Sequence, residues 1–524
     1  MKKILTIILL VCVAINAGAQ LRIPGNGVVE KILNTEQAIY HLYVDTVNEE
    51  KLAEDAIRGM LEKLDPHSSY STPKEVKAMK EPLEGSFEGI GVQFNMLEDT
   101  LVVIQPVFNG PSEKVGILAG DRIIAVNDTA IAGVKMPRED IMKRLRGKKG
   151  SKVKLTVRRR LVADDLTFTV VREKIPVKTV DAVYMLEPAV GYIRLGSFGS
   201  TTYKEFMEGT QKLADMGMKT LVIDLQENGG GYLQSAVDIA GEILQEGDLI
   251  VYTKGRRYQP QRFFAKGSGK LRHVRVVVLI NEFSASAAEI LAGAIQDQDR
   301  GTIVGRRSFG KGLVQRPIEF NDGSMIRLTV AHYYTPSGRC IQKPYKKGDM
   351  KDYEMDLDRR LKHGELTSPD SIHFDDSLKY HTLRNRRVVY GGGGIMPDEF
   401  VPLDTMRYTR LHRQLMVKSI VINQSLKYID QNRKTLKKAY PAFDRFLALY
   451  EVPDKFVDDI IAEGVKQGVK PRDDKEATLT RPFLKNQLKS LVARDLWDMT
   501  EYFRIYNQTN DIVTRALDVI HREH

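Results

Sequence analysis

The sequence has little cysteine and no long hydrophobic run beyond its first residues. Of its 524 residues two are cysteines, and Cys12 lies in an N-terminal apolar segment, so Cys340 is the only cysteine in the rest of the chain. An intramolecular disulfide framework is therefore excluded. The fold must rely on the burial of apolar side chains, for which a chain of this length is sufficient.

The sequence also lacks the motifs of common metal and serine hydrolases. It contains no His-Glu-x-x-His, no paired Cys or His cluster and no Gly-x-Ser-x-Gly, so no metal or cofactor is expected. The net charge of +11 is a small excess of 79 basic over 68 acidic residues. The basic clusters Arg158-Arg159-Arg160 and Arg386-Arg387 have no interleaved aromatic residues, and we expect no nucleic-acid partner.

The first residues resemble a secretory signal peptide. Lys2 and Lys3 precede an apolar run from Ile4 to Ile15, and Ala17-Gly18-Ala19 provides a cleavage site after Ala19, so that residues 1–19 would be removed. The run is shorter than the roughly 20 residues that span a bilayer, which disfavours a permanent anchor. A lipidated Cys12 is disfavoured because the preceding valine is bulkier than usual. We expect an exported protein.

Changes of pattern along the rest of the chain predict a multidomain α+β protein. Apolar residues at helical spacing before the breaker Asp65-Pro66 predict a helical packing region at residues 20–82. Short β runs between glycines, with one helical stretch at Arg138–Leu145, predict a β-rich domain at 83–175. Residues 405–524 have helical spacing interrupted by prolines and predict a C-terminal helical domain.

Residues 176–404 are predicted to form an α/β domain. Thr220–Leu225 and Val274–Ile280 are near-continuous apolar runs, as in a sheet buried on both faces, and a helical pattern lies between them. A polar insertion at about 346–387 has few apolar anchors and is expected to be a surface excursion. The four glycines Gly391–Gly394 are expected to form a flexible return from it.

A serine-bearing strand-to-helix junction is the first candidate for chemistry. Asn281 to Ile290 passes from a strand end into a small-residue helix that contains Ser284 and Ser286. The first turn of a helix has unpaired N–H groups and a positive dipole end, which favour the negative charge that develops in acyl transfer. By itself this motif is more often a site of close helix packing, so it does not decide the function.

Lys311, between two glycines, is the second candidate. Partial desolvation would lower its pKa and make it a general base. On a strand, Gln315 would share a face with Lys311, and its amide oxygen could accept a hydrogen bond from the amine. The surrounding segment nearly spells a phosphate-binding loop, but Gly312 stands where a Mg²⁺-binding Ser or Thr is needed and a strand-like run follows.

Residues 83–175 resemble a PDZ domain. Gly89-Ile90-Gly91-Val92 is similar to the carboxylate-binding loop of such domains, and Gly120 to Asn127 is similar to the turn and strand that follow. Backbone N–H groups of such a loop capture a terminal carboxylate, while the adjoining strand edge pairs with the peptide. Gly89, Ile90, Gly91 and Val92 are therefore the expected peptide-binding residues.

With this module, three ordered motifs resemble the C-terminal processing peptidases, also called tail-specific proteases. These motifs are Asp224 to Gly231, Ser284 to Glu289 and Phe309 to Gln315, and the resemblance extends from about Asn34 to Pro402. It implies a serine endopeptidase of the bacterial envelope, in the periplasm. Such an enzyme binds protein C-termini through its PDZ domain and cuts peptide bonds with a Ser/Lys dyad in a crotonase-like α/β core.

The resemblance also assigns roles to residues. Ser286 takes the nucleophile position, Lys311 that of the general base and Gln315 that of the residue supporting the lysine, with Ser284 as the competing nucleophile. The oxyanion position matches the N–H groups of Ala287 and of the glycine turn, Gly231 with its neighbour Gly230. Two departures, Gln226 for an arginine and Gly229 for a frequent proline, affect the turn geometry and the arginine's structural role.

Other functions stay open from the sequence alone. One is an inert PDZ-containing envelope scaffold that binds protein tails without cutting them. Another is a Ser-His-Asp hydrolase using His332 or His67, although neither has an evident orienting partner. A catalytic Cys340 is disfavoured. An adaptor protein, peripheral membrane association and homo-oligomerisation also stay open.

Overall fold

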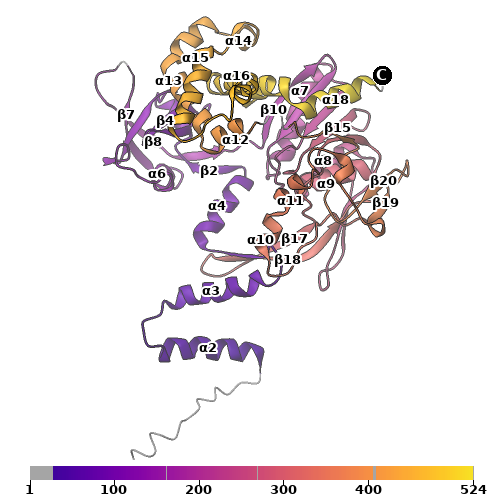
Figure 1. Ribbon diagram of the computed structural model, residues 1–524. Helices are drawn as coiled ribbons and strands as arrows, with labels where there is room; N and C mark the ends of the chain where they lie inside the picture. The colour runs from indigo at the N-terminus through magenta and orange to yellow at the C-terminus, as the bar shows by residue number, and fades with distance from the viewer. Residues whose placement is uncertain (1–26, 161, 268, 405–408, 523–524) are drawn as a thin grey trace, which may run out of the picture.

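The computed structural model describes residues 27–160, 162–267, 269–404 and 409–522. The predicted signal peptide and Cys12 lie outside the described residues. The predicted multidomain α+β architecture is confirmed: N-terminal helices, a β-rich domain, an α/β core and C-terminal helices follow one another along the chain (Figure 1). Among the helices of the described ranges, none is long and apolar enough to cross a membrane.

The N-terminal region projects from the body as a helical pair, α2 (Val28–Leu42) and α3 (Glu49–Glu62) (Figure 1). No side chain of α2 is buried. The chain then forms a short strand, β1 (Ser69–Ser71), which the helical prediction missed, and α4 (Pro73–Leu83). Thr72 caps α4, and its side chain accepts from Glu75 N, as expected for a helix that begins with proline at its first position.

The β-rich domain consists of an antiparallel sheet in the order β3-β4-β5-β7-β8, in which β6 also pairs with β5, and a separate two-stranded sheet of β2 and β9. Alternating burial along β7 shows the period of two expected for a sheet with one face on a core. The strand β3 lies at the edge of the sheet, with no partner on its outer side within the described chain. The elements are β2 (Ser86–Gly89), β3 (Val92–Leu97), β4 (Thr100–Pro106), α5 (Pro111–Lys114), β5 (Arg122–Val126), β6 (Thr129–Ala130), α6 (Arg138–Leu145), β7 (Lys152–Arg158), β8 (Leu166–Val171) and β9 (Glu173–Pro176).

The α/β core is built on a six-stranded sheet in the order β10-β11-β12-β15-β16-β21, parallel except for the antiparallel β10. All residues of β11 and β12 are buried, which explains their near-continuous apolar sequence. The elements are β10 (Val180–Glu187), β11 (Val190–Leu195), α7 (Thr202–Asp215), β12 (Thr220–Asp224), α8 (Leu233–Ile243), β15 (Arg275–Ile280), α9 (Ala287–Asp297), β16 (Gly301–Gly305) and β21 (Glu399–Phe400).

A second sheet joins the N-terminal segment to the core. Its order is β1-β18-β13-β14, and β17 pairs with β18 as a hairpin. The pairing places Ser69 opposite Arg327 of β18. The chain before the β-rich domain is thereby incorporated into the core. The strands are β13 (Leu249–Lys254), β14 (Gln261–Phe264), β17 (Leu313–Glu319) and β18 (Met325–Tyr334).

The polar insertion is anchored, contrary to the expectation of a surface excursion. Arg360 and Tyr353 are buried, and Arg360 donates to the carbonyls of Arg307 and Ser308. The return is also ordered, because Gly392 and Gly394 donate to the carbonyls of Cys340 and Ile341. The insertion contains α10 (Met350–Glu354), α11 (Asp356–Lys362), the 3₁₀ turns Pro369–Ser371 and Asp376–Leu378, and the hairpin β19 (Lys379–His381) and β20 (Val388–Tyr390).

The C-terminal helices lie between the β-rich domain and the core (Figure 1). Asp430 of α13 forms an ion pair with Arg122 of β5 at 2.6 Å, and Phe503 and Val513 are buried against the outer face of the core sheet. Pro482 lies inside α16 and does not break it. The helices are α12 (Arg410–Val417), α13 (Ile420–Ala439), α14 (Phe443–Leu449), α15 (Asp454–Lys466), α16 (Asp474–Leu496), α17 (Met499–Tyr506) and α18 (Asp511–Arg522), with a 3₁₀ turn at Asn507–Thr509.

Candidate active site

Ser286 occupies a sharp turn between β15 and α9. It is the N-cap of α9. Its backbone has φ 57° and ψ −114°, a conformation that residues other than glycine rarely adopt. Such strained residues concentrate at active sites, where the surrounding structure holds them in place. Ser286 is partly exposed at the beginning of a helix, which suits a nucleophile.

Ser284, the competing nucleophile, has a structural role. It is fully buried, donates to the carbonyl of Leu225 at 2.7 Å and accepts from Asn281 N at 2.9 Å. These bonds tie the serine loop to the end of β12. The hydroxyl of Ser284 is thus engaged by the backbone on both sides.

The glycine turn after β12 lies directly against Ser286. A Cβ atom at Gly230 would stand 2.7 Å from Ser286 Cβ and 2.9 Å from Ala287 N, so no other residue fits there. Gly231 has φ 145° and would bring a Cβ to 2.1 Å from the carbonyl oxygen of Phe198. Both glycines are therefore required by close backbone approach.

The same turn defines the oxyanion donors. The N–H of Gly230 is already bound to Asn228 Oδ1 at 2.8 Å, which leaves Gly230 a packing role. The N–H groups of Gly231 and Ala287 have no acceptor among the described residues. They are the two groups at this turn that can bind a developing oxyanion.

Lys311 lies in the loop between β16 and β17, with its amine largely buried. Burial lowers the pKa of Lys311, the Arg327 guanidinium lowers it further, and the carboxylates of Glu289 and Asp65 oppose the shift. No ion pair or hydrogen bond of Nζ occurs within the described ranges, including with Ser286 Oγ. The amine is therefore unpaired and desolvated, which favours its neutral form.

The buried carboxylate of Glu289 connects the two loops. Its Oε2 accepts from Ser286 N and from Lys311 N, both at 2.8 Å, and its Oε1 accepts from Gly310 N at 2.7 Å and Ser308 Oγ at 2.5 Å. Burial raises the pKa of Glu289, whereas these four donors oppose that shift. The sequence interpretation treated Glu289 only as part of a motif, yet it holds both candidate catalytic residues.

Tyr333 bridges the same two residues from the carbonyl side. Its buried hydroxyl contacts the carbonyl oxygen of Lys311 and lies 3.1 Å from that of Ser286. Tyr333 comes from β18, so the second sheet helps to position the active site. Nothing in the local sequence distinguishes this tyrosine from the many others in the chain.

The N-terminal segment contributes to the site, contrary to its interpretation as packing without chemistry. Asp65 accepts from Ser68 Oγ at 2.5 Å and from Thr329 Oγ1 at 2.8 Å, which attaches the segment to β18. Burial and the nearby charge of Lys311 lower the pKa of His67 to about 4. His67 is thus neutral beside the amine. In the sequence, the segment Leu64 to Tyr70, which contains the helix breaker Asp65-Pro66, was the feature that could have indicated this contribution.

The predicted hydrogen bond between Gln315 and the Lys311 amine is not formed in the described chain. Lys311 precedes β17, and a bulge between Val314 and Gln315 interrupts the alternation that was expected to align the two side chains. The amide nitrogen of Gln315 donates to the carbonyl of Leu313 at 3.2 Å. In the described chain Gln315 makes no hydrogen bond with Lys311.

A buried arginine from a neighbouring strand supports the end of β12. Arg194 of β11 is buried, donates to Asp224 at 2.7 Å and to the carbonyl of Gln226 at 2.8 Å, and lies over the Phe503 ring at 4.5 Å. Its guanidinium holds the end of β12 directly before the glycine turn. The C-terminal domain thus contacts the structure that supports the oxyanion donors.

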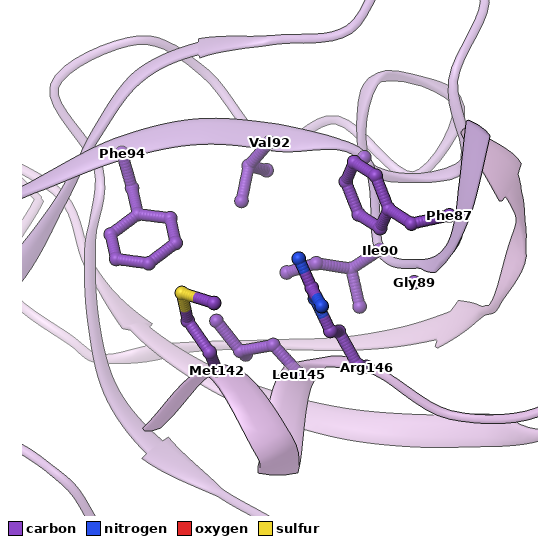
Figure 2. Close-up of a pocket in the computed structure, with 9 residues that line it drawn as sticks. Phe87, Gly89, Ile90, Val92, Phe94, Met142, Leu145 and Arg146 are labelled. Carbon is purple, nitrogen blue, oxygen red and sulfur yellow. The ribbon is translucent and has the colours of Figure 1, made fainter. Parts of the chain in front are cut away.

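The predicted PDZ loop lines a small apolar pocket of about 60 Å³ between β3 and α6 (Figure 2). Ile90 and Val92 face Met142 and Leu145 across it, and Phe94 closes one end. The Arg146 guanidinium lies over the Phe87 ring at 4.9 Å and pairs with Glu81. The apolar lining of this pocket suits an apolar side chain, whereas the Arg146 cation at its rim is already paired within the chain.

The histidine and cysteine alternatives find little support in the geometry. His67 contacts Tyr353 Oη at 2.9 Å, and His332 Nδ1 lies 3.7 Å from Cys340 Sγ. Burial raises the pKa of the Cys340 thiol, which disfavours a thiolate. Within the described ranges, no three His, Cys, Asp or Glu side chains form a group that could hold a metal ion.

Comparison with known families gives matches over most of the chain. Peptidase family S41 matches residues 189–353, the PDZ domain family matches 89–171, and the N-terminal domain of the activating protease CtpB matches 16–74. Residues 411–498 match a family of unknown function.

Curated relatives agree with these matches, and a solved structure is also similar in sequence. A carboxy-terminal-processing protease of Bartonella bacilliformis is 39% identical over 305 residues, 57% of this chain and 69% of that protein. The carboxy-terminal processing protease CtpA of Bacillus subtilis is 33% identical over 350 residues, 65% of this chain and 74% of that protein. The photosystem II D1 C-terminal processing protease is 27% identical, with 72% of this chain and 94% of that chain covered and a TM-score of 0.36.

These matches define a serine-type peptidase that carries a PDZ domain for binding peptides. The chain belongs to the carboxy-terminal processing proteases of peptidase family S41.

Proposed function

We propose that the protein cuts peptide bonds with a dyad of Ser286 and Lys311, acting on exported proteins that its PDZ domain binds by their C-termini. The observation that carries this proposal is the buried Lys311 amine, which has a lowered pKa and no carboxylate partner among the described residues. An amine in this state can act as a base near neutral pH.

The proposed reaction begins when neutral Lys311 takes the proton of Ser286 Oγ, which attacks the carbonyl carbon of the substrate. The tetrahedral oxyanion accepts hydrogen bonds from the N–H groups of Gly231 and Ala287. Lys311, now an ammonium, protonates the leaving amine as the peptide bond breaks. Water, deprotonated by Lys311, then hydrolyses the acyl-enzyme and restores Ser286.

The hydroxyl and the amine must approach each other before this reaction. The described chain contains no hydrogen bond between Ser286 Oγ and Lys311 Nζ. Catalytic hydrogen bonds are often formed only in the substrate complex. We propose that tail binding at the PDZ domain gates this step, and that Gln315 supports the lysine amine once the site has closed.

Export is part of the same proposal. The N-terminal pattern of Lys2-Lys3, an apolar run and Ala17-Gly18-Ala19 supports cleavage after Ala19 and a periplasmic location. Cell fractionation with N-terminal sequencing of the mature protein tests this placement. A full-length chain in the cytoplasmic fraction would contradict it.

The dyad is tested with four variants and one substrate, a protein with an unstructured apolar C-terminal tail. Ser286→Ala and Lys311→Ala should abolish cleavage, whereas Ser284→Ala should keep much of it. Lys311→Arg should also be inactive, because guanidinium does not deprotonate in this range. A serine-directed phosphonate should label the wild type at Ser286. Tail binding without cleavage or labelling would instead identify an inert scaffold.

A further inference from the structure

A cavity of about 510 Å³ lies between the peptidase core and the C-terminal helices, beside the loops of the active site. Gln226 and Glu227 after β12, Phe283 after β15 and Arg306 after β16 form its core side. Residues at the starts of α12 and α18 and before α16 form the opposite side. Its volume is in the range of ligand-binding sites.

The unpartnered polar groups at this cavity are hydrogen-bond donors. Gln226 is 7% exposed, and its buried Nε2 has no hydrogen-bond partner in the described structure. Arg410, Arg413 and Arg472 line the cavity with exposed side chains, and none of the three forms an ion pair within the described ranges. A buried donor without an acceptor is costly unless a ligand supplies one.

The carboxylates at the cavity are engaged elsewhere. Glu282 pairs with the buried Arg306 at 2.7 Å, and Glu227 lies 3.7 Å from Arg194. Asp404 and Asp511 each take part in a further interaction. Arg410, Arg413 and Arg472 are the charged side chains of the lining that form no ion pair in the described ranges, and a ligand complementary to them is an anion with several acceptor oxygens.

Chain connectivity places the cavity close to the reacting bond. Phe283 is three residues from Ser286 and Glu227 is three residues from Gly230. Because consecutive Cα atoms are 3.8 Å apart, each of these cavity residues lies within about 11 Å of the catalytic turn. An extended polypeptide spans this distance in roughly three or four residues.

We propose that this cavity is a substrate subsite that accepts an acidic side chain three or four residues from the scissile bond. Arg413 and Arg472 bind the carboxylate, and Gln226 Nε2 donates to it from the cavity floor. The subsite rests on the proposed peptidase function and specifies its substrates as chains with Asp or Glu near the cut. It gives the C-terminal domain a direct part in substrate selection.

The test uses two internally quenched peptides with the same apolar C-terminal tail. One carries Glu and the other Gln at the third and fourth positions on both sides of the scissile bond. Wild-type kcat/KM should be about tenfold higher for the Glu peptide, as expected for a charge-assisted hydrogen bond. The double variant Arg413→Gln, Arg472→Gln should lose this ratio while cleaving the Gln peptide at the wild-type rate.

The matched control is Arg445→Gln, which removes an exposed arginine of α14 that does not line the cavity. This control variant should keep the wild-type ratio of kcat/KM for the Glu peptide to kcat/KM for the Gln peptide. Equal kcat/KM for the two peptides with the wild type would overturn the subsite. If the wild type cuts neither peptide, the peptidase proposal fails, and fluorescence anisotropy then decides the subsite: weaker binding of the Gln peptide supports it, and equal affinities overturn it.

Discussion

Ser286 and Lys311 share one acceptor, because their backbone N–H groups both donate to Oε2 of Glu289 at 2.8 Å. The two residues come from loops after different strands, β15 and β16. The carboxylate therefore fixes the distance between the candidate nucleophile loop and the candidate base loop, and Tyr333 does the same from the carbonyl side.

Replacing Glu289 by Gln should show whether Glu289 positions the loops of Ser286 and Lys311 for catalysis or only stabilises the fold. The amide nitrogen accepts no hydrogen bond, so one of the two donor pairs, Ser286 N with Lys311 N or Gly310 N with Ser308 Oγ, loses its acceptor and the link between the two loops is weakened. We expect kcat to fall about 100-fold, as for other losses of transition-state positioning, with KM nearly unchanged. Steady-state kinetics and circular dichroism check this. The control Glu246→Gln, at an exposed glutamate, should behave like the wild type.

The rate of cleavage should increase with pH through the lowered pKa of Lys311, since the base must be neutral. Arg327 contributes to that lowering, so Arg327→Gln should raise the pKa and move the rising limb of the kcat/KM profile to higher pH. Activity lost at neutral pH should return in alkaline buffer. The exposed Arg257→Gln serves as control, and an unshifted limb in Arg327→Gln would contradict the electrostatic account.

Lys311→Met should inactivate the enzyme and raise its free energy of unfolding at neutral pH. The pKa of Lys311 is lower in the folded chain than in the unfolded chain, so the unfolded state binds more protons between the two values and wild-type stability rises with pH in that window. Methionine removes this cost of burying a cation. Urea denaturation at several pH values checks the sign, and a less stable Lys311→Met variant at neutral pH would contradict it.

The PDZ pocket should prefer a free carboxylate after an apolar residue. Amidation of the tail peptide should weaken binding about tenfold, because the loop N–H groups lose a charged acceptor. Met142→Glu should have a similar effect by placing a negative charge in the pocket. Val134→Glu adds the same charge at an exposed position outside the pocket and should bind normally in fluorescence anisotropy.

The C-terminal domain should be required for the stability of the core. Phe503 is 6% exposed and packs on Arg194, so Phe503→Ala should lower the free energy of unfolding by about 3 kcal/mol through lost burial and a cavity. Leu449→Ala, at a side chain 61% exposed, should change it by less than about 0.5 kcal/mol. Chemical denaturation measures both, and equal losses would contradict the packing argument.

Local sequence patterns predicted helices and strands well where apolar residues recur at a fixed spacing. The helix Arg138–Leu145 has the predicted bounds, because the amphipathic period is set by neighbouring residues. The insertion was misjudged, since a charged residue, Arg360, is buried in it beside the few apolar anchors such as Tyr353 and Leu366. Burial of a charged group depends on distant partners, which no local pattern records.

The sequence by itself determined the class of enzyme and singled out Ser286 and Lys311 as candidates, because ordered motifs are properties of the chain. Only the tertiary structure decided what surrounds them: Glu289 and Tyr333 bridging both residues, Asp65 and His67 brought to the amine, and Arg194 holding the end of β12. Hydrogen bonds and electrostatic fields act across space, and folding brings together groups that lie hundreds of residues apart in the chain.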